Sequence, residues 1–206
     1  MDEIAWDFYV RYAESEVWME STLWLGKPVR KTPFDLWIYQ EILSRTRPDV
    51  IIETGTLFGG SALFLASICE CLGNGRVISI DINPKEDLPT HPRILYLTGS
   101  SIASDVIDLV GREVADSDRV MVILDADHRD DHVLGELRAY APLVTEGCYL
   151  IVEDTMAGCD QERWGGGPSA AIEEYMRSNE SFEIDPECEK FLMTFNPGGY
   201  FKRVRT

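Results

Sequence analysis

The stretch "DVIIETGTLFGGSALFLASICECLGNGRVISIDI", residues 49–82, contains two short runs rich in Val and Ile on either side of a longer apolar segment. The short runs have the length and composition of buried strands, and the longer segment has the length of a helix. A glycine-rich turn separates the first run from that segment. The pattern predicts a βαβ unit, whose two strands lie parallel in one sheet.

The same alternation continues toward the C-terminus. The sequence predicts further strands at "RILYLTGS", "RVMVILDA" and "CYLIVEDT", with helices near 104–110, 131–144 and 169–177. The final segments, "SFEID" and "FLMTFNPGGYFKRV", are predicted to form two strands joined by a turn. We therefore expect an α/β fold with a mostly parallel sheet, an antiparallel C-terminal strand, and helices on both faces.

Length and charge limit the possible functions. The chain has 206 residues, the size of one domain or of one domain with an extension. Residues 1–47 are rich in Trp and predict a helical cap, and residues 48–206 form the main domain. A net charge of −17 argues against binding to nucleic acid or to an anionic membrane.

Cysteine usage and the N-terminus indicate the compartment. The first ten residues lack the basic start of a signal peptide, and no apolar run approaches the roughly 20 residues of a membrane helix. The cysteines are odd in number and include no CxxC pair, which predicts reduced thiols in a cytoplasmic protein. They are Cys69, Cys71, Cys148, Cys159 and Cys188.

The turn "GTLFGGS", residues 55–61, predicts a ligand site. Its glycines Gly55, Gly59 and Gly60 allow the backbone to turn sharply and approach a ligand. The spacing departs from the dinucleotide fingerprint GxGxxG, and no Lys follows as in a Walker A loop. Asp81 ends the next strand, where an acid accepts hydrogen bonds from ribose hydroxyls. Turn and acid together favour an adenosine-type cofactor.

Acidic residues end two later strands. Asp125 ends the fourth predicted strand, and Glu153 and Asp154 end the fifth. If these strands are neighbours, three carboxylates converge and require a cation. Oxygen ligands select hard ions, so we expect Mg²⁺, with Mn²⁺ or Ca²⁺ as alternatives. The remaining acids of the first cluster are expected at the surface or at a helix start: Asp127, Asp130 and Asp131.

Two histidines follow Asp125. His128 is in the loop at the same sheet edge, and beside a metal it is a suitable general base. His132 falls within the next predicted helix and is expected to be structural or at the surface.

Several separated motifs resemble one known family. "GKPVRKTPFDLWIYQEILSRTRPDVIIETGTLFGGSALFLA", "ISIDI", "LDADH", "YLIVEDT" and "NPGGYFKR" resemble the cephalosporin hydroxylase/rhamnosyl O-methyltransferase family, over roughly residues 23–205. The chain is also similar, more distantly, to the metal-dependent catechol O-methyltransferases. The resemblance implies a Rossmann-like class I methyltransferase sheet that binds S-adenosylmethionine (SAM).

Specific roles follow from this resemblance. It implies that Glu53, Gly55 and Gly59 line the SAM pocket, with Asp81 on the ribose and Ser101 near the adenine. The full set of predicted cofactor-binding residues is Glu53, Gly55, Thr56, Gly59, Ser61, Asp81, Ser101 and Asp125. The predicted metal ligands are Asp125, Glu153 and Asp154, and the predicted catalytic base is His128.

The expected reaction is Mg²⁺-dependent methyl transfer to a hydroxyl of a small molecule, a sugar or another natural-product alcohol or diol. We expect a homo-oligomer. Three alternatives remain open. A non-haem iron hydroxylase would use His128, His132 and Asp125. The others are a non-catalytic SAM-binding protein and a nicotinamide-dependent reductase, against which the missing GxGxxG counts. The loop 156–168, with three consecutive glycines and Trp164, is predicted to be a lid.

Overall fold

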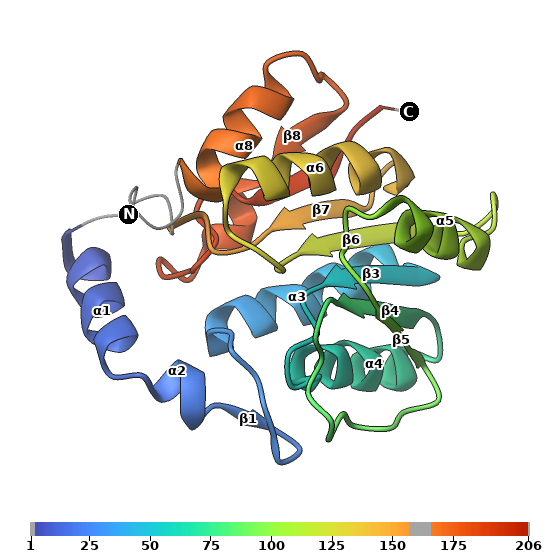
Figure 1. Cartoon of the computed structure of the whole chain (residues 1–206). Helices are drawn as coiled ribbons and strands as arrows, with labels where there is room; N and C mark the ends of the chain where they lie inside the picture. Colours follow the sequence, from blue (N-terminus) through green and yellow to red (C-terminus); the bar gives the residue numbers. More distant parts are fainter. Residues whose placement is uncertain (1–2, 157–165, 206) are drawn as a thin grey trace.

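The computed structural model describes residues 3–156 and 166–205, and its centre is a seven-stranded sheet (Figure 1). The strand order is β5-β4-β3-β6-β7-β9-β8. The first five strands in this order are parallel, whereas β9 runs antiparallel to β7 and to β8. The strands span Val50–Thr54 (β3), Arg76–Asp81 (β4), Ile94–Thr98 (β5), Val120–Leu124 (β6), Tyr149–Val152 (β7), Phe182–Ile184 (β8) and Tyr200–Arg203 (β9). The predicted mixed α/β sheet is confirmed.

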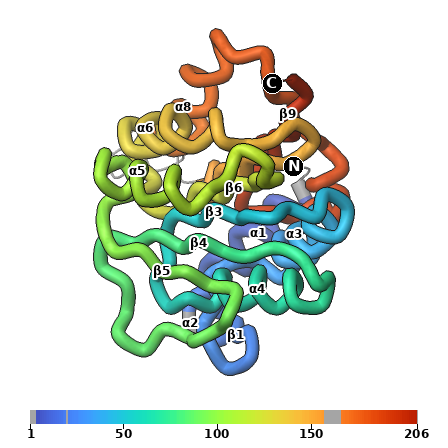
Figure 2. Tube along the Cα trace, turned by 90° about the vertical axis from the view of Figure 1, so that its right-hand side faces the viewer, coloured from blue at the N-terminus to red at the C-terminus, as the bar shows by residue number. Residues whose placement is uncertain are grey.

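Helices cover both faces of the sheet (Figure 2). One face packs against α3 (Pro33–Thr46) and α4 (Gly60–Leu72), and the other against α5 (Ser104–Glu113), α6 (Asp130–Tyr140) and α8 (Gly167–Met176). Alternate residues of each strand serve alternate faces, since Ile51 packs with the first group and Ile52 with the second. Short 3₁₀ turns occur at Ala141–Leu143 and Pro186–Glu189. All five parallel strands therefore direct their carboxyl ends to one edge.

The N-terminal segment lies at this edge. It forms α1 (Glu3–Glu14), α2 (Val17–Glu20) and a small antiparallel pair, β1 (Leu23–Trp24) with β2 (Lys27–Pro28), where the sequence predicted mostly helix. The Trp24 ring packs edge-on against Phe64 of α4 at 4.9 Å between centroids. The side chains of α3 join the same core as those of α4. The division of the chain at residue 47 stays a prediction.

The C-terminal prediction was wrong in one part. Residues 191–199 form no strand, and only Tyr200–Arg203 of the predicted second strand pairs with its neighbours. The backbone N–H of Phe195 donates to the buried carboxylate of Asp35 at 3.1 Å, and the Thr194 hydroxyl donates to the same carboxylate. These bonds to α3 replace a strand partner and hold the segment near the carboxyl edge.

The described residues cover only part of two further predictions, which concern the lid and membrane-spanning helices. Most of the predicted lid, including Trp164, lies outside the described residues. Within residues 3–156 and 166–205, none of the helices has both the length and the apolar character needed to span a bilayer.

Candidate active site

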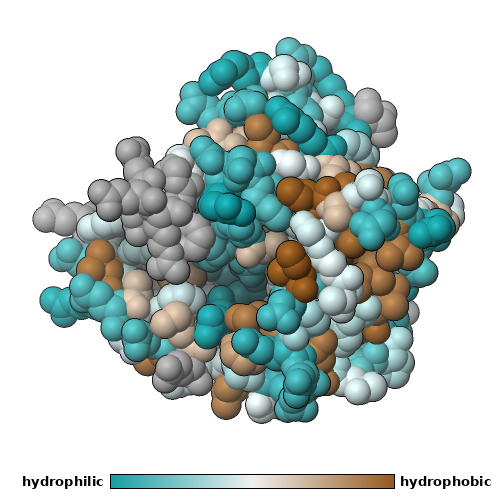
Figure 3. Space-filling model, in the orientation of Figure 1, coloured by the Kyte–Doolittle hydropathy of each residue, from teal (hydrophilic) through white to brown (hydrophobic). Residues whose placement is uncertain are grey.

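A cleft opens at the carboxyl edge of the sheet, and its hollow faces the viewer in Figure 3. It consists of two adjoining cavities of about 650 and 640 Å³. Both are lined by Gly55, Asp81, Ala126 and His128. The turn after β3 and the loop after β6 therefore form a common wall, where ligands of parallel α/β sheets bind.

The glycine turn is packed tightly against this wall. Gly55 has a φ of +90°, and a Cβ there would lie 1.9 Å from the backbone oxygen of Asp125. Gly59 also has a positive φ, +71°, and precedes the first residue of α4. A side chain at Gly55 would separate the turn from β6, so this glycine is required by contact as well as by conformation.

The predicted cofactor-binding residues occupy different depths. Asp81 lines both cavities, and its carboxylate accepts hydrogen bonds from the backbone N–H of Leu57 and Asn83, at 2.8 and 2.7 Å. Ser101 lines the second cavity. Thr56 and Ser61 line a small recess beside Gly55, and Asp125 lines both that recess and the first cavity.

Glu53 lies beneath the turn and is fully buried. Its Oε2 accepts a hydrogen bond from Ser79 at 2.7 Å, while Oε1 has no hydrogen-bond partner among the described residues. Burial raises the pKa of Glu53. Neither Glu53 nor Gly59 is among the residues that line the two main cavities.

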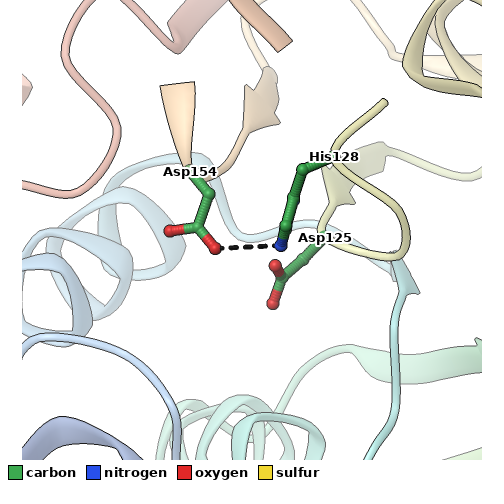
Figure 4. A group of neighbouring side chains, drawn as sticks. All are labelled: Asp125, His128 and Asp154. Atoms are coloured by element: carbon green, nitrogen blue, oxygen red, sulfur yellow. Dashed lines mark ion pairs between the residues drawn. The ribbon is translucent and has the colours of Figure 1, made fainter. Parts of the chain in front are cut away.

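Asp125, His128 and Asp154 meet at the floor of the first cavity (Figure 4). One donor atom from each lies within 4.8 Å of the other two, and His128 Nε2 is 3.2 Å from Asp154 Oδ2. The residues come from the loops after the neighbouring strands β6 and β7, as the sequence predicted for the two acids. The two carboxylates are donors suitable for a hard divalent cation, and the imidazole lies beside them.

The backbone of Asp154 is adapted to this arrangement. Its φ is 52°, in the left-handed region that a non-glycine residue rarely occupies. The backbone N–H of Asp154 donates to Asn196 Oδ1 at 2.9 Å, which stabilises this conformation. Unusual backbone conformations are frequent at functional sites, where the surrounding structure stabilises them.

Glu153 faces a different neighbour. Its Oε1 accepts hydrogen bonds from Lys31 Nζ at 2.6 Å and from the Tyr39 hydroxyl at 2.7 Å. Lys31 also lies 2.7 Å from Asp125 Oδ2. The metal-type cluster of the described residues contains Asp125 and Asp154 without Glu153. The two adjacent carboxylates therefore have different partners: Glu153 faces Lys31 and Tyr39, and Asp154 faces His128.

Burial controls the charges of this site. It raises the pKa of Asp125 and Asp154 to about 6 and that of Glu153 to about 7, although Lys31 and His128 oppose these shifts. Burial disfavours the Lys31 ammonium, but Asp125 and Glu153 outweigh this effect and raise the pKa of Lys31 above its usual range. One buried ammonium therefore faces more than one carboxylate. The negative charge of the site is only partly compensated, so a further cation would be attracted to it.

His132 lies apart from this cluster. Its Nε2 is 3.1 Å from the Ser101 hydroxyl and 3.5 Å from Glu136 Oε1. It is half-buried and lines the second cavity, not the surface. The set His128, His132 and Asp125 drawn for an iron hydroxylase is not brought together. Among the described residues, the group of possible metal ligands contains His128 and Asp125 without His132, whose Nε2 faces Ser101 and Glu136.

Several residues of the cleft were missed by the sequence analysis. Lys31 was not identified, since a single Lys in the polar stretch "VRKT" carries no motif. An aromatic and apolar wall facing the metal-type cluster was also missed; it comprises Tyr9, Ala13, Trp18, Met19 and Phe195. The Trp-rich composition of residues 1–47 was the available signal for it.

Comparison with known proteins identifies the family. The sequence profile described as Rhamnosyl O-methyltransferase/CmcI matches residues 16–204. A Rhamnosyl O-methyltransferase of Mycobacterium leprae is 37% identical over 210 residues, covering 98% of this chain and 91% of that protein. An apo-structure of CmcI superposes with a TM-score of 0.71 at 23% identity, covering 90% of this chain and 77% of CmcI.

A second CmcI structure, with Mg and SAM, superposes with a TM-score of 0.66 at 22% identity, covering 89% of this chain and 77% of that one. These structural likenesses show a shared fold, and the profile and the relative show the family. The chain therefore belongs to the Rhamnosyl O-methyltransferase/CmcI family, and it is a SAM-dependent O-methyltransferase.

Proposed function

We propose that this protein transfers the methyl group of SAM to a hydroxyl of a sugar or another natural-product alcohol, with Mg²⁺ bound beside the acceptor. The observation that carries this proposal is the convergence of Asp125, Asp154 and His128 at the floor of a cleft whose other wall is the glycine turn. The relatives named Rhamnosyl O-methyltransferase support a sugar hydroxyl as the acceptor.

The residues of the second cavity and of the turn suit SAM. The Asp81 carboxylate faces the cleft where ribose hydroxyls would need an acceptor. The unpaired Oε1 of Glu53 offers negative charge beneath the turn, toward which a cationic group such as the SAM amino group is attracted. Gly55 leaves room for a ligand to contact the backbone, and Thr56 and Ser61 line the recess beside it.

The donor atoms of the cluster suit a hard divalent cation. We assign Asp125 and Asp154 as the metal-binding carboxylates, and we revise the role of Glu153 to that of positioning Lys31, which in turn holds Asp125. Mg²⁺ bound there would lower the pKa of an acceptor hydroxyl and fix its position. Mn²⁺ accepts the same donors and would serve as a substitute.

His128 acts as the general base in this proposal. Asp154 Oδ2 lies 3.2 Å from Nε2 and orients the imidazole. The acceptor O–H transfers its proton to His128, the oxygen forms a bond to the methyl carbon, and the carbon–sulfur bond of SAM breaks. The electron pair of that bond stays on sulfur, which gives S-adenosylhomocysteine (SAH) and a methyl ether.

The wall opposite the cluster limits the acceptor. Tyr9, Trp18 and Phe195 pack around one another, with Tyr9 and Trp18 each edge-on to Phe195 at 5.6 and 5.3 Å. An aromatic wall stacks on the apolar face of a sugar ring and excludes water. We also propose that residues 1–47 cap this site and that the protein forms a homo-oligomer.

The experiment is a reaction of the purified protein with SAM, Mg²⁺ and a panel of rhamnosides, other glycosides and simple diols. Mass spectrometry then detects SAH and the acceptor with one added methyl group. We expect methylation of a glycoside that requires Mg²⁺. Ferrous iron with oxygen, given to the same panel, should yield no hydroxylated product; a hydroxylated acceptor would replace this proposal with the iron hydroxylase.

A further inference from the structure

Asn196 lies between the proposed metal ligand Asp154 and two buried tyrosines. Its own side chain is fully buried. The side-chain oxygen Oδ1 accepts the backbone N–H of Asp154 at 2.9 Å. The side-chain nitrogen Nδ2 lies 3.2 Å from the Tyr39 hydroxyl and 3.4 Å from the Tyr200 hydroxyl. One amide group therefore joins the loop after β7 to α3 and to β9.

Two carboxylates fix the orientation of this amide. The Tyr39 hydroxyl donates to Glu153 at 2.7 Å, and the Tyr200 hydroxyl donates to Asp35 at 2.8 Å. Each hydroxyl has a single hydrogen, so both hydroxyl oxygens act as acceptors toward the amide nitrogen of Asn196. The amide oxygen is then the end that faces the backbone N–H of the metal ligand, because a flipped amide would oppose two donors.

The backbone of Asn196 is also held on both sides. Its N–H donates to the Thr194 hydroxyl at 3.0 Å, and its carbonyl oxygen accepts the N–H of Gly199 at 2.9 Å. The Thr194 hydroxyl in turn donates to the buried Asp35 carboxylate. Every polar group of Asn196 has a partner, and a fully satisfied buried network of this kind makes its members rigid.

The same segment holds the chain before and after Asp154. The backbone N–H of Val152 donates to Gly199 at 2.9 Å, and the Thr155 hydroxyl donates to the backbone oxygen of Pro197 at 2.8 Å. A Cβ at Gly199 would lie 2.2 Å from the Val152 carbonyl oxygen, so the two chains are in close contact. Asp154 lies between these fixed points with a φ of 52°, a conformation that persists only where contacts stabilise it.

We propose that Asn196 is a positioning residue for the metal site. Its amide oxygen holds the backbone of Asp154 in the conformation that presents the carboxylate beside Asp125 and His128 (Figure 4). Asn196 is not among the residues that line the two main cavities, so it acts through Asp154. This inference rests on the proposed function, because it assumes that Asp154 binds the cation.

The test measures the affinity for Mn²⁺ directly, by electron paramagnetic resonance of the free ion. Asn196→Leu is close to Asn in shape but lacks the acceptor, and we expect Mn²⁺ to bind about 10- to 100-fold more weakly, as when a group that orients a metal ligand is lost. Asn196→Asp keeps an oxygen acceptor and should bind Mn²⁺ at least as tightly as the wild type. If Asn196→Leu does not fold, Asn196→Ser replaces it, because its short side chain cannot reach the position of Oδ1.

Two controls identify the site that is measured. Asp154→Asn should remove the tight Mn²⁺ binding, which separates this site from the acidic surface. Asn179→Leu is the matched control, because Asn179 Oδ1 also accepts a backbone N–H, from Ser181 at 2.8 Å, and lines a cavity apart from the cleft. It should leave the affinity for Mn²⁺ unchanged. The affinity of Asn196→Leu for SAH should stay within about threefold of the wild type, because the two sites are separate.

Kinetics provide a second measurement. Asn196→Leu should raise the Mg²⁺ concentration needed for half-maximal activity by about 10- to 100-fold and leave the KM for SAM unchanged. A purely structural role would lower the melting temperature without moving this Mg²⁺ requirement.

The outcomes distinguish the inference from the proposed function. Equal Mn²⁺ affinities of the wild type and Asn196→Leu, or a loss of about tenfold that Asn196→Asp shares, would overturn the inference and leave the proposed function standing. If the wild type binds no Mn²⁺, the metal is removed from the proposed function and the inference fails with it.

Discussion

Lys31 Nζ lies 2.7 Å from Asp125 Oδ2, and the two residues are 94 positions apart in the chain. The same ammonium lies 2.6 Å from Glu153 Oε1, and its side chain is only 3% exposed. A single buried cation therefore ties the segment before α3 to the ends of β6 and β7. It compensates part of the negative charge at the proposed metal site.

Removal of this cation should destabilise the protein. We expect Lys31→Met to lower the free energy of unfolding by about 3–5 kcal/mol without metal, because it leaves buried carboxylates unpaired. Saturating Mg²⁺ should reduce that loss by supplying positive charge. Urea unfolding with and without Mg²⁺ measures both effects.

Lys27→Met is the matched control for the lysine experiment. Lys27 pairs with Asp87, whose side chain is 97% exposed, so its removal should change stability by less than about 1 kcal/mol. Equal effects of the two substitutions on the free energy of unfolding would show that burial of the Lys31 ion pairs adds nothing to stability.

The pH dependence follows from the raised pKa of Asp125 and Asp154, each about 6. The folded protein binds more protons than the unfolded chain between the ordinary carboxyl pKa of about 4 and this value. These two groups therefore make the metal-free protein less stable as the pH rises from about 4 to 6. Mg²⁺ affinity should change in the opposite direction, rising over the same interval as the carboxylates ionise.

The variant Asp154→Asn tests this pH behaviour. Without metal at pH 7 it should be more stable than the wild type, and the difference should vanish toward pH 4. Thermal unfolding across this range measures the effect. A wild type that loses stability steadily below pH 6 relative to Asp154→Asn would contradict the raised pKa values.

The close approach of the glycine turn predicts a strong effect at one position. Gly55→Ala would place a Cβ against the Asp125 carbonyl and force a side chain into the left-handed region. We expect stability to fall by at least about 2 kcal/mol and SAH binding to be lost. Gly111→Ala, inside α5 with no atom near the added Cβ, should be neutral or stabilising by up to about 1 kcal/mol.

Asp81 provides a test of the ribose assignment. Asp81→Asn keeps the shape of the side chain but removes its charge, and we expect SAH affinity to fall about 10- to 100-fold, as for the loss of charge-assisted hydrogen bonds. Asp108→Asn, exposed on α5, is the control. Unchanged SAH affinity of the Asp81 variant in calorimetry would remove Asp81 from the site.

The sequence predicted which strand ends form this site, but not the contacts among its buried side chains. Asp125 and Asp154 could be placed together because each ends a strand of a parallel sheet, and the carboxyl ends of such strands share one edge. That Glu153 lies at the same edge was predictable for the same reason, whereas its orientation was not, because β7 ends at Val152 and Asp154 has a left-handed backbone conformation. The contacts of Lys31 were not, because its partners lie 94 and 122 residues away and no local pattern encodes them.

The region around α6 shows the same limit. The four-residue spacing of His132 and Glu136 predicts that they share a helix face, but not that this face is buried against Ser101. The second predicted C-terminal strand failed over residues 191–199 for a related reason. A buried carboxylate from α3, Asp35, binds the backbone there, and periodicity does not reveal such a partner.

The most direct test of the account measures SAH formation with p-nitrophenyl rhamnoside, or the glycoside from the panel that reacts fastest. We predict that the wild type is active with Mg²⁺, loses activity with a chelator and recovers when Mg²⁺ is restored. Asp125→Asn should lose most activity while still binding SAH. His128→Ala should retain Mg²⁺ and SAH but lose about 10²–10⁴-fold in kcat, with a smaller loss at high pH. Full activity of Asp125→Asn in the presence of the chelator would contradict the metal-dependent mechanism.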